Sequence, residues 1–164
     1  MSKAVLISIR PEWCEKIING QKTIEVRKTR PKMNPPFKCY IYRSVQGGVV
    51  GEFVCDDIFE RIVRVGAICE PPKYCICDWN MDCTPLDTLL ADACLTKDEL
   101  EKYLDGGVGY GWHISNLKIY DTPRELREFY AVPNEVEVAL KAKPKPVTRP
   151  PQSWRYVEEE LWND

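Results

Sequence analysis

The densest group of chemically active side chains lies in residues 20–30, which read GQKTIEVRKTR. Four basic side chains lie close in sequence to one carboxylate, Glu25: they are Lys22, Arg27, Lys28 and Arg30. Lysine and arginine bind phosphate, and a carboxylate can orient an arginine or accept a hydrogen bond from a nucleobase. The segment therefore predicts a cleft for a phosphate-bearing or nucleotide-like ligand. The alternative is a solvated strand face with an ordinary Glu–Arg ladder, which contributes little to stability.

Two predicted elements would position these side chains. A helix is expected to begin at Pro11, a residue favoured in the first turn, and to end at Gly20, which tolerates a left-handed backbone. Residues 23–30 then alternate, with Ile24 and Val26 on one face and polar side chains on the other. That period predicts a half-buried strand with a polar face, and the helix–strand junction gathers the cations at one end of it.

The chain before and far after this segment adds further positive charge. Residues 4–9 form an apolar run that predicts the first strand, and Ser8 and Arg10 lie near its end, so both are expected to flank the cleft. Residues 141–155 hold five basic side chains and no acidic one, and are expected to form an extended segment that enlarges the basic face. In contrast, residues 51–105 hold five basic and thirteen acidic side chains.

Several motifs occur in an order that is familiar from one family. The chain contains LISIRPEW over residues 6–13, a G-x-K-x-x-E-x-R pattern over residues 20–27, GEFV over 51–54 and YGWHIS over 110–115. With these motifs most of the chain resembles the ASCH domain of the PUA-like superfamily. The segment RPPQSW, residues 149–154, is similar to the ending of a bacterial and phage subgroup.

The resemblance implies a PUA-like β-barrel that binds RNA or modified nucleosides in a cleft beside the first helix. The family's signature residues line that cleft, and here they are Lys22, Glu25 and Arg27. It also implies one ASCH domain over residues 1–164, with an acidic, partly helical insertion at about 66–106.

Some small members of the family resemble amidohydrolases that act on N4-acetylcytidine with Lys, Thr and Glu side chains. Lys22 matches the lysine, but Glu25 stands where those enzymes have threonine, and their distal glutamate has no counterpart in the segment Asp92-Ala93-Cys94. A carboxylate beside Lys22 also favours the charged ammonium, whereas a nucleophile must be neutral. Binding of RNA or a modified nucleotide is therefore expected, with a hydrolase (Lys22 and Glu25 catalytic) as the alternative.

The strand expected at residues 109–120 carries further candidates. Trp112 could stack on an unpaired base, although its alternation with Tyr110 and Ile114 favours a place in the core. His113 and Ser115 fall on the opposite face and are expected to line the cleft. With a single histidine and no G-x-S-x-G elbow, the sequence does not predict a serine-hydrolase triad.

The eight cysteines are expected as thiols in a reducing cytosol. Four of them have the spacing C-x5-C-x-C-x5-C, which could hold a structural zinc ion: Cys69, Cys75, Cys77 and Cys83. Buried free thiols are the alternative, because the tight C-x-C differs from the usual C-x2-C turn. We expect no cofactor and, in the absence of a long apolar run or signal-peptide pattern, a cytoplasmic protein with no membrane partner.

The remaining pattern indicates the fold class. Strands are predicted over residues 39–45 and 51–63 with a hairpin between them, and a helix with a capping box begins after Thr96. Another short helix is expected to begin near Thr122, with Pro123 in its first turn. Five or six strands with short helices predict a small α+β fold, most economically a closed or nearly closed mixed β-barrel. A third interpretation is a protein-binding module whose acidic insertion forms the contact surface.

Overall fold

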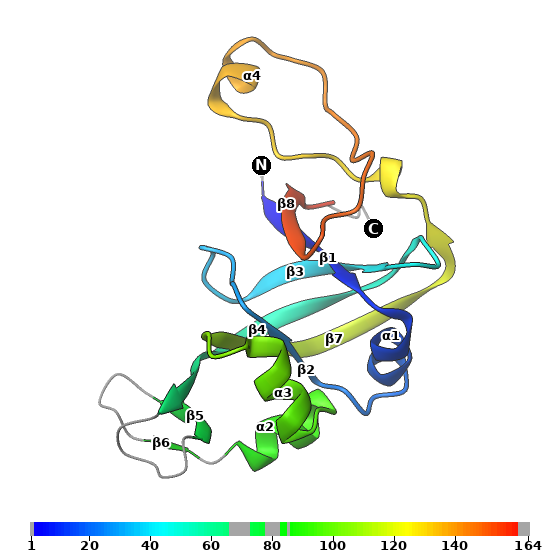
Figure 1. The fold of residues 1–164 in the computed structure, drawn as a ribbon. Helices are drawn as coiled ribbons and strands as arrows, with labels where there is room; N and C mark the ends of the chain where they lie inside the picture. The colour runs from blue at the N-terminus through cyan, green and yellow to red at the C-terminus, as the bar shows by residue number, and fades with distance from the viewer. Residues whose placement is uncertain (1, 66–72, 78–82, 85, 161–164) are drawn as a thin grey trace. The chain divides into compact units, whose positions relative to one another are not determined.

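The computed structural model describes residues 2–65, 73–77, 83–84 and 86–160 (Figure 1). The chain divides into two compact units. The first contains residues 1–15, 36–54 and 116–164, and the second contains residues 16–35 and 55–115. Two long strands, β4 (Val49–Val65) and β7 (Gly109–Arg124), run through both units, so each unit is a sheet built partly from the same strands.

The first unit is organised around β1 (Lys3–Ile9). This strand pairs in parallel with β3 (Phe37–Arg43) and antiparallel with β8 (Trp154–Glu158). Because β1 is covered on both edges and both faces, its apolar run is almost completely buried, as expected for a central strand. The core of the unit joins residues from both ends of the chain: Ala4, Leu6, Tyr40, Val49, Phe129, Val147 and Val157.

The helix α1 (Pro11–Ile18) follows β1, and Cys14 and Ile17 are its buried residues. Ile18, which the sequence places on the apolar stripe, is 45% exposed. Gly20 has φ +82°, which confirms its predicted role as the left-handed residue after the helix. The predicted hairpin is also present, because the N–H of Arg43 donates to the carbonyl of Gly48 between β3 and β4.

The second unit is organised around β2 (Ile24–Arg27), which pairs antiparallel with β7. The outer part of β4 pairs with β5 (Lys73–Cys77), and β5 pairs with β6 (Cys83–Thr84). Two helices, α2 (Asp87–Ala93) and α3 (Lys97–Leu104), complete the unit. Thr96 caps α3 by accepting a hydrogen bond from the N–H of Glu99, as the sequence predicts.

The acidic insertion supplies part of the core of this second unit. Leu89 and Ala93 of α2 and Leu100 and Leu104 of α3 pack in one cluster with Ile24 and Val26 of β2. Apolar burial of this kind is what stabilises short helices that would be marginal alone. The insertion is therefore structural, and a partner-binding role for its surface stays a prediction.

The strand order across the sheet is β2-β7-β4-β3-β1-β8, with β5 and β6 added beside β4. The β1–β3 pair is parallel, whereas β1–β8, β2–β7, β4–β5 and β5–β6 are antiparallel, so the sheet is mixed. This confirms the predicted α+β class with short helices. Among the described helices, none has the length and apolar character to cross a bilayer.

The region after β7 differs from the sequence prediction. Thr122 and Pro123 lie in β7 itself, and only a single 3-10 turn follows, η1 (Leu126–Glu128), with Glu125 as its capping residue. Glu125 accepts from the N3 backbone and Glu128 reaches back to the N–H of Glu125, so the cap belongs to this pair and not to Thr122. The prediction of a helix beginning near Thr122 was wrong.

Strands β5 and β6 have no counterpart in the sequence prediction, and neither do two elements nearer the C-terminus. The arm after η1 carries the short helix α4 (Glu135–Ala139) and returns to β8, in orange and red in Figure 1. The last strand, β8, is stabilised by pairing with β1 far away in sequence. The chain between α4 and β8 is largely irregular, in agreement with the extended basic segment predicted for residues 141–155.

We expect Leu100→Ala to destabilise the protein by about 2–5 kcal/mol, because it leaves a cavity in a core to which the insertion contributes. Leu100 is 0% exposed, whereas Leu140 in the arm is 75% exposed and provides a matched control. Urea unfolding followed by circular dichroism measures both variants. Equal stabilities of Leu100→Ala and Leu140→Ala would contradict the assignment of the insertion to the core.

Candidate functional site

The signature side chains form a buried ionic cluster in the second unit. Arg27 Nε lies 2.9 Å from Glu25 Oε1, and Lys22 Nζ lies 3.4 Å from Glu25 Oε2. Lys22, Glu25 and Arg27 are 3%, 7% and 9% exposed. Both carboxylate oxygens are thus engaged by cations.

Backbone contacts hold Lys22 in place. Its N–H donates to the carbonyl of Lys16 in α1, and its Nζ donates to the carbonyl of Ala93 at 2.6 Å. Ala93 is the last residue of α2, where backbone carbonyls lack helical partners and attract a cation. The N–H of Thr23 donates to the carbonyl of Asp92 beside it. The junction after α1 is therefore fixed onto the end of α2.

The sheet holds Glu25 and Arg27. Across the β2–β7 pair Glu25 is opposite Trp112 and Arg27 is opposite Tyr110, and opposed residues share a face of a sheet. Trp112 is 0% exposed, so this face is buried. The polar face is present as predicted, but β2 is buried on both faces, so the prediction that the strand is half-buried was wrong. The face is polar, but its charges are paired with one another, which permits their burial.

Because it is buried, this cluster differs in its energetics from a row of Glu–Arg pairs on the protein surface. Removing charges from water costs several kcal/mol per ion, and the cost is recovered only when partners are well placed. Charges buried in this way are also screened by salt less than exposed ones.

Tyr103 of α3 lies beside this cluster, and sequence patterns did not single it out. Lys28 Nζ lies 5.1 Å from the centre of the Tyr103 ring. Burial raises the pKa of Tyr103, the positive charge of Arg27 opposes the rise and the charge of Glu25 adds to it. The phenol therefore stays neutral at physiological pH. The only sequence signal for Tyr103 is its position between Leu100 and Leu104, the buried residues of a capped helix.

His113 and Ser115 form a separate polar group on β7. His113 Nδ1 lies 2.6 Å from Asp56 Oδ1, and the two side chains are 37% and 45% exposed. The hydrogen bond from His113 lowers the pKa of Asp56, and a hydrogen bond from Ser115 contributes in the same direction. The two predicted residues are thus brought together, by a carboxylate that the sequence analysis had not included.

The other predicted site residues have different local environments. Ser8 donates through Oγ to the carbonyl of Pro151 and is part of the first unit. Arg10, in the same unit, is exposed, and its carbonyl accepts from the N–H groups of Trp13 and Cys14 at the start of α1. Lys28 is exposed in the second unit.

Arg30 and Trp112 have structural roles. Arg30 donates from its guanidinium to the carbonyls of Pro31 and Met33, and so supports the loop after β2. Trp112 is fully buried, which agrees with the core position favoured by the alternation of its strand. A base could not stack on its ring in this conformation.

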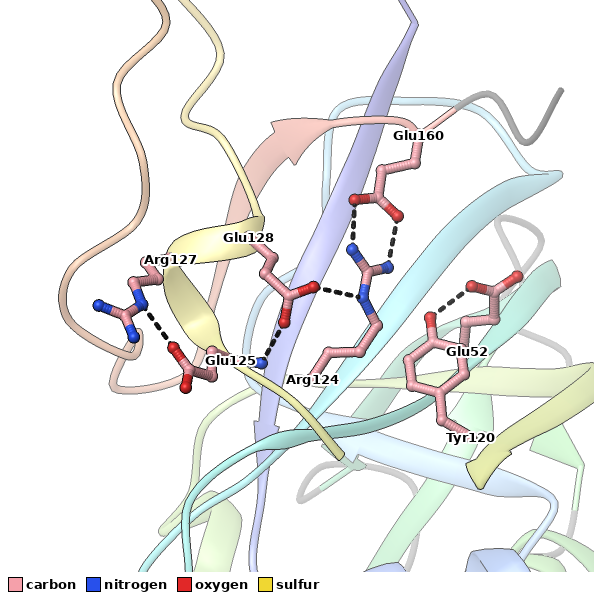
Figure 2. A network of polar contacts seen from close by, with 7 residues as sticks. All are labelled: Glu52, Tyr120, Arg124, Glu125, Arg127, Glu128 and Glu160. Carbon is pink, nitrogen blue, oxygen red and sulfur yellow. Dashed lines mark hydrogen bonds and ion pairs between the residues drawn. The ribbon is translucent and has the colours of Figure 1, made fainter. Parts of the chain in front are cut away.

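A second polar network lies in the first unit, where sequence patterns had not indicated one (Figure 2). Tyr120 donates to Glu52 Oε2 at 2.5 Å, and the guanidinium of Arg124 pairs with both carboxylate oxygens of Glu160 at 2.5 and 2.7 Å. Burial, followed by the hydrogen bond to Glu52, raises the pKa of Tyr120. Arg124 also lies 4.5 Å above the ring of Phe129. The network attaches the C-terminal residues to β7 and stabilises the unit.

The proposed zinc ligands are only partly described. Cys75 is buried on β5, and Cys77 and Cys83 are opposite each other in the β5–β6 pair. Cys69 lies outside the described residues. Among those that are described, no group of three or more His, Cys, Asp or Glu residues is placed to hold a metal ion.

Comparisons with known proteins agree with the fold. The sequence model of the ASCH domain family matches residues 7–71. The crystal structure of ASCH from Zymomonas mobilis is similar, with 17% identity, a TM-score of 0.60 and coverage of 95% of this chain and 88% of that one. A tyrosine-to-phenylalanine variant of that protein gives 17% identity, a TM-score of 0.60 and coverage of 96% and 92%. No curated protein matches.

The family match covers the end of β1 from Ile7, then α1, the signature over residues 20–27, and strands β3 and β4. The structural match extends the same arrangement over nearly the whole chain, which confirms the PUA-like α+β fold. Residues 7–71 therefore match the ASCH domain family, and the chain has the fold of a solved ASCH structure.

Proposed function

We propose that this protein binds RNA or a modified nucleotide, with the Lys22–Glu25–Arg27 cluster providing positive charge to a phosphate of the ligand. The observation that carries the proposal is the burial of two basic side chains around one carboxyl group, directly before the exposed Lys28. Because buried charges are screened less than exposed ones, their field acts strongly on an anion at the adjacent surface. Phosphate contacts of this type supply most of the sequence-independent affinity for nucleic acids.

Lys28 is the residue of this region best placed to contact the ligand directly. It follows Arg27 at the end of β2, and its side chain is exposed. Burying a lysine costs free energy because its charge leaves water, and an exposed lysine can contact a phosphate without that cost. In this proposal the buried Lys22 and Arg27 orient the anion, and Lys28 contacts it.

The geometry does not favour the hydrolase alternative. Lys22 Nζ donates to the carbonyl of Ala93 at 2.6 Å and lies 3.4 Å from Glu25 Oε2. Both contacts occupy the Nζ group that would have to act as the nucleophile or general base. Lys22 therefore acts as a fixed cation in this proposal.

Lys28→Ala is expected to weaken binding of a short single-stranded RNA and to reduce the slope of log affinity against log salt by about 0.7, as for loss of one phosphate contact. Lys118→Ala, an exposed lysine on the part of β7 in the first unit, is the control and should leave both quantities unchanged. Fluorescence anisotropy at several salt concentrations measures them. Identical salt slopes for the wild type and Lys28→Ala would rule out this phosphate contact.

Glu25→Gln is expected to reduce the free energy of unfolding by about 3–5 kcal/mol, because it leaves Lys22 and Arg27 buried without their carboxylate. Glu125→Gln is a matched control, since Glu125 pairs with Arg127 at the same sequence spacing, but with side chains 61% and 74% exposed. Urea unfolding compares the variants. If Glu25→Gln is no less stable than Glu125→Gln, the buried cluster does not have the energetic role assigned to it.

Incubation with N4-acetylcytidine is expected to give no cytidine above the buffer control, because Lys22 Nζ is engaged by the carbonyl of Ala93 and by Glu25. Chromatography of the nucleosides measures the reaction. Release of cytidine that disappears in Lys22→Met, with an unchanged circular dichroism spectrum, would instead identify the protein as a hydrolase.

A further inference from the structure

The second unit presents an aromatic ring beside its cationic cluster. Tyr103 is 40% exposed, whereas Tyr74 and Trp112 in the same unit are 4% and 0% exposed. Its ring is in contact with exposed Lys28, and the charges of Arg27 and Glu25 act on its phenol. An accessible ring next to cations is the combination that single-stranded nucleic-acid sites use, with bases stacked on the ring and phosphates on the cations.

The position of Tyr103 is rigid. Leu100 and Leu104, on the same helix, are buried at 0% and 3% exposure in the core of the unit. Thr96 caps the first turn of α3, and Asp105 ends the helix in a left-handed conformation. A ring held in this way loses little conformational entropy when a flat ligand stacks on it.

Lys28 and Tyr103 can contact different parts of one nucleotide, the lysine its phosphate and the ring its base. The contact between Lys28 Nζ and the ring is an exposed cation–π interaction, which is weaker than the stacking of a base on an aromatic ring. A base can therefore replace the ammonium on the ring, and the released Lys28 can pair with the neighbouring phosphate. The phenol stays neutral at physiological pH, so it does not repel that phosphate.

We propose that Tyr103 is the base-stacking platform of this protein, so that the ligand is an unpaired nucleotide whose base lies on α3 and whose phosphate lies on the end of β2. This inference rests on the proposed function and assigns it a ligand class, single-stranded over duplex RNA. It also gives the acidic insertion a direct role in recognition through one of its helices.

The test compares a short single-stranded RNA with an abasic strand of the same length, which keeps the phosphates and removes the bases. Tyr103→Leu is expected to reduce affinity for the base-containing strand by about 5- to 100-fold, as for loss of one stacked base, and to leave the abasic strand within about twofold. Tyr103→Phe should bind nearly as the wild type does. Tyr130→Leu is the matched control, because Tyr130 is 39% exposed in the first unit.

Three results would overturn the proposal in distinguishable ways. If Tyr103→Leu lowers affinity for both strands equally, or no more than Tyr130→Leu does, Tyr103 is not a platform although the chain binds RNA. If the wild type prefers duplex RNA to the single strand, the ligand class is wrong. If the wild type binds neither strand, the proposed function itself fails. Thermal unfolding of each variant verifies that the fold is retained.

Discussion

The structure of the second unit depends on the buried ionic cluster around Glu25. One carboxylate is bound by Lys22 and Arg27, and all three side chains are nearly inaccessible to water. Such a cluster is stable only if its surroundings hold each partner in place. The carbonyl of Ala93 at the end of α2 holds Lys22, and the β2–β7 register holds Glu25 and Arg27. Burial of Lys22, Glu25 and Arg27 therefore requires the helices of the insertion.

The two units contain their polar networks for different reasons. In the first, Arg124 pairs with Glu160 and stacks on Phe129, so that a charged group secures the end of the chain to β7. The charged side chains there pair with one another, and the contacts explain local stability. In the second, the buried ion pairs lie beside the exposed Lys28 and the ring of Tyr103. This lysine and this ring are the groups that the proposed anionic ligand would contact.

The sequence by itself determined the local elements and the identity of the charged cluster. Pro11 and Gly20 marked the limits of α1, and Thr96 marked the start of α3, because caps and turn residues act within a few positions along the chain. The spacing of Lys22 and Glu25 likewise predicted a common site, since side chains three positions apart in sequence cannot be far apart.

Only the tertiary structure decided which of these groups are buried and what lies beside them. Alternation on β2 predicted a polar face, but the burial of that face depends on Trp112 and α2, which reach it from distant parts of the chain. Tyr103 meets Lys28 for the same reason. Strand β8 was missed because its partner, β1, lies at the opposite end of the sequence. Such pairings depend on which segments exclude water together, a property of the whole fold that local spacing does not encode.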